Sequence, residues 1–115
     1  MTTTIQPTDL ASRLLALPSR LEQAERAALA AAQALASAKE ALIDQETYFL
    51  LGGHIDGKNQ AERDAKLRDL TSPERLEVWE AQERAAEAAL RLRIIQEESR
   101  ALRSVARLVG REEEE

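Results

Sequence analysis

The residues that come nearest to a known chemistry lie in one glycine-rich stretch, residues 52–59. Gly52 is followed after four residues by Gly57-Lys58-Asn59, which differs from the phosphate-loop pattern only in having Asn59 where Ser or Thr is needed. In that loop a strand delivers backbone N–H groups and a helix N-terminus to the phosphates, while the hydroxyl holds magnesium. Here a helix is expected before the glycines and no strand is predicted. We therefore interpret the stretch as a helix-to-helix turn without a cofactor.

The same stretch contains His54, which is the single histidine, and Asp56 two residues later. An imidazole with one carboxylate could begin a metal site, but the sequence has no second imidazole and no thiolate to complete it. A loop-based enzyme that uses His54, Asp56 and Lys58 is one hypothesis. Carboxylates elsewhere are expected on outward positions of charged helices, which does not favour acid–base catalysis. The sequence therefore predicts no catalytic residue, no metal ligand, no cofactor and no enzyme activity.

A row of arginines in the last part of the chain could contact phosphate groups. Residues 91–111 contain six Arg and two Glu, a local balance of +4 in a chain whose net charge is −5. A seven-residue spacing places most of this row on one helix face, where it could follow a nucleic-acid backbone. The alternative is that the row pairs with acidic side chains of a neighbouring helix or of the tail Glu112–Glu115. The candidate nucleic-acid-binding residues are Arg93, Arg100, Arg103 and Arg107.

Two long apolar stripes must position these groups. Each stripe has an apolar residue alternately every three and four positions, which predicts helices wrapped along one another, and its many alanines allow close approach. Gln45 and Ser99 are polar members that we expect to set the register between helices. The first stripe contains Leu14, Leu17, Leu21, Ala24, Ala28, Ala31, Leu35, Ala38, Leu42, Gln45 and Phe49, and the second contains Val78, Ala81, Ala85, Ala88, Leu92, Ile95, Ser99, Leu102, Ala106 and Val109.

Proline, glycine and capping residues predict the helix boundaries. Pro18 predicts a break after a short helix over 10–17, and Gly52-Gly53 predicts the end of the long helix that follows. Asn59 with Glu62 forms a capping-box pattern, which predicts a short helix over roughly 60–70. The predicted organisation is a disordered arm over 1–8, one helical-hairpin domain over 9–110 with long helices over about 18–51 and 73–109 and a connector over 52–72, and an acidic tail over 111–115.

The composition predicts an all-α protein in which the two long helices form an antiparallel hairpin. The chain has 115 residues, room for one domain, and its 32% charged and 3% aromatic content is typical of long helices. The hairpin should place Tyr48, Phe49 and Trp79 at the loop end. The absence of cysteine permits a reducing compartment, the first residues do not resemble a signal peptide, and no apolar stretch approaches the ~20 residues of a membrane span. We expect a cytoplasmic protein.

Each long helix also has a second apolar row beside its stripe. Burying a Leu or Ile contributes roughly 1.5–3 kcal/mol, so a lone hairpin that left these rows in water would lose much of the stability of a small domain. We expect hairpins to associate into a four-helix bundle of two chains or a larger ring. The alternative is that the short helices fold back over the rows. The predicted oligomer interface contains Leu15, Leu29, Ile43, Leu50, Leu76, Leu90, Ile94 and Leu108, with Ala36 and Ala101 between them.

Two pieces of the sequence resemble a known group of proteins. They are the run Gly57-Lys58-Asn59 with Glu62 and Arg63, and the run Arg100-Ala101-Leu102-Arg103 with Leu108. Together with the heptads between them, they resemble small uncharacterised helical-hairpin proteins of bacterial and phage genomes. This resemblance implies a coiled-coil hairpin and brings no assigned activity. In layout the chain is also similar to phage recombination-mediator proteins that assemble into rings, which supports the nucleic-acid hypothesis.

The predicted function is that of a non-enzymatic, self-associating helical hairpin that serves as an assembly or adaptor module. A second copy of the chain is the expected partner, with another helical protein as an alternative and no membrane contact. The alternative function is that of an oligomeric accessory protein that binds single-stranded nucleic acid, related to phage recombination, through the arginine row.

Overall fold

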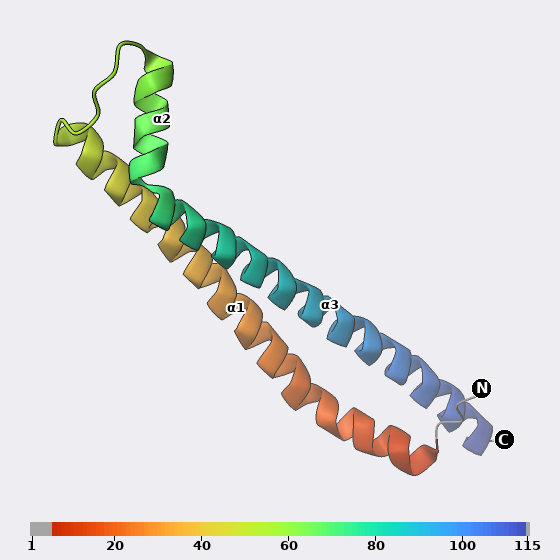
Figure 1. Ribbon diagram of the computed structural model, residues 1–115. Helices are drawn as coiled ribbons and strands as arrows, with labels where there is room; N and C mark the ends of the chain where they lie inside the picture. Colours follow the sequence, from red (N-terminus) through yellow and green to blue (C-terminus); the bar gives the residue numbers. More distant parts are fainter. Residues whose placement is uncertain (1–5, 115) are drawn as a thin grey trace. The chain divides into compact units, whose positions relative to one another are not determined.

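The computed structural model describes residues 6–114, which contain three helices and no strand. Helix α1 spans Pro7–Leu51, α2 spans Gln60–Leu70 and α3 spans Ser72–Glu114 (Figure 1). The all-α prediction is confirmed, and α1 packs against α3 in a hairpin-like arrangement. Residues 1–5, which make up most of the predicted arm, lie outside the described residues.

The structure corrects the predicted break at Pro18, because α1 continues through this residue and there is no separate helix over 10–17 (Figure 1). A proline inside a helix costs about 3 kcal/mol, through a lost hydrogen bond and a clash with the preceding turn. Leu10 and Leu17 lie before the proline and are both buried against Leu102 of α3. Burial of two leucines stabilises by roughly 3–6 kcal/mol in total. Packing therefore outweighs the local preference for a break.

The helix ends at both termini also differ from the prediction. α1 begins at Pro7, since a proline fits the first position of a helix, where its missing N–H is not needed. α3 continues through Gly110 to Glu114, so Gly110 does not stop the helix and residues 111–114 are not a separate tail. A glycine inside a helix costs only about 1 kcal/mol.

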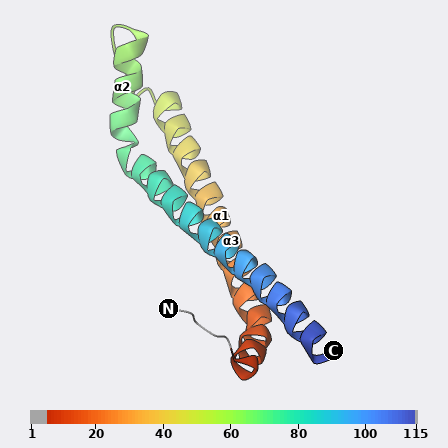
Figure 2. The ribbon, with the colours of Figure 1, turned by 90° about the vertical axis from the view of Figure 1, so that its right-hand side faces the viewer.

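The predicted end of the first long helix and the predicted short helix are confirmed. α1 ends at Leu51, and within residues 6–114 Gly53 is the residue with a positive φ, 70°. The His54 N–H donates to the Phe49 carbonyl at 3.2 Å, as expected where a left-handed glycine ends a helix. α2 begins directly after its cap Asn59, as the capping pattern predicted. Figure 2 shows α2 leading into α3, with Thr71 between them.

The described residues divide into two compact units. The first unit joins residues 6–28 to residues 88–114. Its core is a leucine cluster in which Leu10, Leu17 and Leu102 are buried. Leu17 of α1 lies in this cluster with Leu102 of α3, and three residues later the Arg20 guanidinium binds the carboxylate of Glu98, which precedes Leu102, at 3.0 and 3.1 Å. The two helices are therefore antiparallel here. The half-buried members of the cluster are Leu14, Val105, Ala106 and Val109.

The second unit comprises residues 29–87 and has much smaller side chains at its centre. Ala81 of α3 is only 2% exposed, and Thr71 is fully buried. An ion pair between Arg75 and Glu46, 3.6 Å apart, joins the start of α3 to the end of α1. In the two units taken together, every member of both predicted stripes is buried or half-buried, which confirms the stripes as the packing faces. The prediction of one domain over 9–110 stays a prediction.

Candidate interaction surfaces

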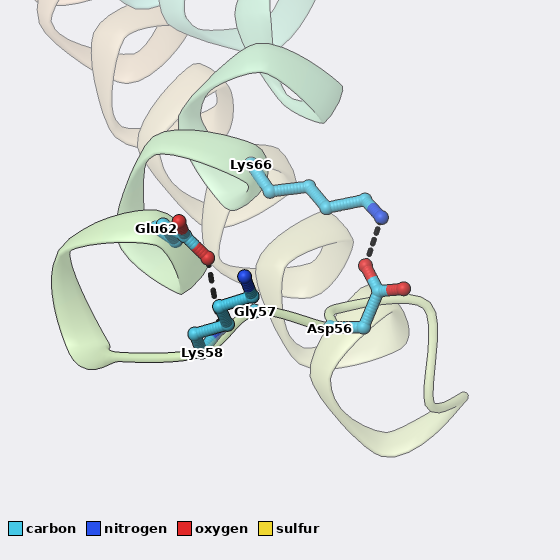
Figure 3. Close-up of a pocket in the computed structure, with 5 residues that line it drawn as sticks. All are labelled: Asp56, Gly57, Lys58, Glu62 and Lys66. Carbon is cyan, nitrogen blue, oxygen red and sulfur yellow. Dashed lines mark hydrogen bonds and ion pairs between the residues drawn. The ribbon is translucent and has the colours of Figure 1, made fainter.

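The loop before α2 forms an open depression of about 520 Å³ (Figure 3). Its lining residues are all exposed, and the Lys66 ammonium donates a hydrogen bond to the Asp56 carboxylate across it. This hydrogen bond, with the positive charge of Lys66, holds the pKa of Asp56 below its usual range. The Lys66 ammonium and the Asp56 carboxylate thus form an ion pair that is exposed to solvent. The lining residues are Asp56, Gly57, Lys58, Glu62 and Lys66.

The chain's own oxygens accept hydrogen bonds from three backbone N–H groups at the start of α2, those of Lys58, Glu62 and Arg63. The Glu62 N–H donates to the Asn59 side-chain oxygen at 2.9 Å, and the Arg63 N–H donates to the Asn59 carbonyl at 3.2 Å. The Glu62 carboxylate accepts from the Lys58 N–H at 2.8 Å, one residue before the position that a standard capping box uses (Figure 3). Asn59 therefore caps α2, and the turn between α1 and α2 accounts for the glycine-rich sequence of residues 52–59.

His54 lies in an aromatic cluster that the sequence did not indicate. Its ring stacks on Tyr48 with centroids 5.6 Å apart and meets Phe49 edge-on at 5.8 Å. Trp79, which was expected at the same end, makes no ring contact with the described aromatic residues. Over the described part of the chain, no three His, Asp or Glu side chains form a group that could hold a metal ion. Gly53 is the sequence feature that could have indicated this cluster, because the turn at this glycine folds His54 back over α1.

The second apolar row of α1, named here the α1 row, faces solvent in the single chain. Leu29 is 60% exposed and Ile43 is 61% exposed. At about 100° per residue, each position of this row points roughly 130° away from the centre of the buried stripe. Neither the N-terminal part of α1 nor α2 covers it, so the alternative in which short helices fold back is not what the chain adopts. The α1 row consists of Leu15, Leu29, Ala36, Ile43 and Leu50.

The corresponding row of α3, named the α3 row, is also exposed along its length. Its members occupy two adjacent outward positions of the heptad and so form a single broad surface on one helix. Exposed leucines are common singly, but a series at regular spacing on one helix face is typical of an interaction site. The α3 row consists of Leu76, Leu90, Ile94, Ala101 and Leu108.

The arginine row lies next to the α3 row, and its side chains are exposed. None of the four candidate arginines forms an ion pair with the described side chains of residues 6–112. Glu98, the acid nearest in sequence to Arg100, instead binds Arg20 of α1. This hydrogen bond lowers the pKa of Glu98. The four arginines are Arg93, Arg100, Arg103 and Arg107.

Over residues 6–114, no helix combines the length and the apolar character that crossing a membrane requires. Comparison of the chain with protein-family models, with curated proteins and with solved structures gave no match in any of the three.

Proposed function

We propose that this protein is a non-enzymatic helical hairpin that associates with itself and acts as an assembly or adaptor module in the cytoplasm. The observation that carries the proposal is the exposure of the α1 row and the α3 row while both primary stripes are buried. Covering one half-exposed Leu or Ile stabilises a complex by on the order of 1 kcal/mol. Several such side chains on each helix supply enough apolar area for a specific interface.

The proposed assembly is a four-helix bundle of two chains or a larger ring, in which the rows form the contacts between hairpins. The chemistry of the loop supports a role without catalysis, because its polar groups bind one another and the N-terminus of α2. Another protein with an amphipathic helix could use the same rows, since an apolar helix face accepts either kind of partner.

The mass in solution tests this proposal. Sedimentation equilibrium at micromolar concentration should give at least twice the chain mass of 12.8 kDa. Replacing Ile43 and Ile94 by Gln should shift the chain toward its monomer mass, because less apolar surface is buried. The matched control replaces the exposed polar residues Gln23 and Gln96, which lie on other helix faces, by Glu and should leave the mass unchanged. A folded wild-type monomer at this concentration would refute the proposal.

A second candidate function is the binding of single-stranded nucleic acid. The exposure of Arg93, Arg100, Arg103 and Arg107, which form no ion pair with the side chains of residues 6–112, favours it. If the four arginines contact phosphates, affinity should fall roughly 50-fold between 50 and 200 mM salt. Charge reversal at Arg100 and Arg107 should then abolish binding. The control variant reverses the exposed Lys39 and Arg84, which changes the net charge equally, and should bind like the wild type. Absence of binding at low salt would exclude this function.

A further inference from the structure

We infer that the α1 row of one copy docks onto the α3 row of a second copy, so that unlike surfaces pair at each contact. This inference rests on the proposed self-association and specifies which surfaces meet. The two rows lie on different helices, and their main parts lie in different units, 29–50 in the second and 90–108 in the first. Each row is therefore an exposed apolar surface of its own unit, and each needs a partner surface to bury it.

The two surfaces have opposite charge. Residues 29–51 of α1 contain one base, Lys39, and three acids, so the segment has a balance of −2. Glu40 and Asp44 are exposed beside Ile43, while Glu46 is held by Arg75 at 3.6 Å. Residues 91–111 of α3 have a balance of +4 from six Arg and two Glu. The acidic α1 surface and the basic α3 surface attract each other, whereas two basic α3 surfaces would repel each other.

The arginines are placed where such a contact would need them. Each member of the series Ile94, Ala101 and Leu108 is directly preceded by an exposed arginine, at a spacing of seven residues. Because Arg93, Arg100 and Arg107 have no ion-pair partner among the side chains of residues 6–112, they are available to acids of another chain. The apolar and charged parts of the α3 surface therefore address the same partner.

The two rows also match in length and period. Leu29 to Leu50 spans 21 residues and Leu90 to Leu108 spans 18, which correspond to about 32 and 27 Å of helix. Leu29, Ala36, Ile43 and Leu50 recur every seven residues, as do Ile94, Ala101 and Leu108, so both rows repeat at about 10.5 Å. Helices that share this period can interlock side chains along their whole length. A second copy of this chain therefore fits each row.

A mixing experiment between two variants tests the pairing. The first variant has Leu29→Arg and Ile43→Arg in the α1 row, and the second has Ile94→Glu and Leu108→Glu in the α3 row. Each substitution places a charge that repels the unlike surface. We expect each variant alone to sediment as a folded monomer. An equimolar mixture retains one intact α1 row and one intact α3 row, so we expect it to form a complex of about twice the monomer mass.

Two outcomes would overturn the inference while leaving self-association in place. Either variant alone could keep the wild-type mass, which would mean that like surfaces pair, or the mixture could stay monomeric although the wild type associates. A wild-type monomer would instead refute the proposed function itself. The control pair Gln23→Arg and Gln96→Glu changes exposed residues on other helix faces and should keep the wild-type mass. Helical circular dichroism of every variant verifies folding. If charge reversal at Arg100 and Arg107 abolishes nucleic-acid binding but leaves the mass unchanged, the charge pairing is refuted.

Discussion

The two units of this protein use different side chains to join the same two helices. In the first unit the contact is made by large aliphatic residues, with Leu17 only 5% exposed against Leu102. In the second unit the best-buried residues are Ala81 and Thr71, and the leucines near them are only partly covered. One contact is filled by side-chain volume, and the other is made by small residues with an ion pair between Arg75 and Glu46. The comparison shows that one heptad pattern can produce two kinds of packing.

The difference has a mechanical consequence for substitutions. A leucine cluster is sensitive to loss of volume, because truncation leaves a cavity that neighbouring side chains fill only in part. An alanine seam is sensitive to added volume, because no space is present for a longer side chain. A smaller side chain should therefore destabilise the first unit most, and a larger side chain should destabilise the second unit most.

Leu17→Ala should have the largest effect, because it empties the centre of the leucine cluster. We expect the free energy of unfolding to fall by about 2–4 kcal/mol. Hydrogen exchange should accelerate most in residues 6–28 and 88–114. Leu51→Ala is the matched control, since Leu51 is 84% exposed, lies outside both rows and should change stability by less than about 0.5 kcal/mol. Equal effects of the two substitutions would contradict the assignment of the core.

Ala81→Leu should be the next largest, and it acts through excess volume. Ala81 is 2% exposed and, with Ala34, Ala38 and Ala41, lines an open groove of about 430 Å³. We expect a loss of about 1–3 kcal/mol in urea unfolding, because the helices must separate to admit the side chain. The exposed Ala86 provides the control, and Ala86→Leu should be close to neutral. A stabilising effect of Ala81→Leu would show that the seam is not closely packed.

Thr71→Val tests the polar part of the second unit at nearly constant volume. The Thr71 hydroxyl donates to the Leu67 carbonyl at 2.8 Å and accepts from the Arg75 Nε at 3.0 Å, in a fully buried position. Removing it should cost about 1–2 kcal/mol, because the Arg75 Nε loses its acceptor and the Leu67 carbonyl keeps only its bond from the Thr71 N–H. Thr47→Val removes a similar hydroxyl-to-carbonyl bond at an exposed site and should cost much less. Thermal unfolding of both variants makes the measurement.

Glu98→Gln should have the smallest effect, because the ion pair with Arg20 is largely open to water. The pKa of Glu98 is lowered in the folded state, so the pair stabilises the protein above the unfolded-state pKa and loses this contribution as pH falls through the folded pKa. We expect Tm at pH 7 to fall by about 2 °C or less. The difference between wild type and variant should disappear under strongly acidic conditions. Glu97→Gln is the control, and a difference that persists in acid would argue against the ion pair.

Much of the exposed apolar surface could be predicted from the sequence, because a heptad row identifies a helix face without knowledge of any partner. The outward direction of Ile43 follows from its spacing to Leu42, which lies in the buried stripe. The pairing of Arg20 with Glu98 could not be predicted. These residues are 78 positions apart, and their contact depends on how far α3 slides along α1. The position of His54 over Tyr48 depended in the same way on the path of one turn.

The sequence by itself determined the helical class, the two buried stripes and the capped start of α2, because each follows from interactions between residues three to seven apart. Only the tertiary structure decided that α1 continues through Pro18 and that α3 continues through Gly110. Local preference opposes the helix at Pro18, and contacts with residues distant in the chain, such as Leu17 with Leu102, outweigh it. At Gly110 the local cost is only about 1 kcal/mol. Local signals specify where a helix can form and end, as at Gly53, whereas burial of side chains against another helix can carry a helix through a local break.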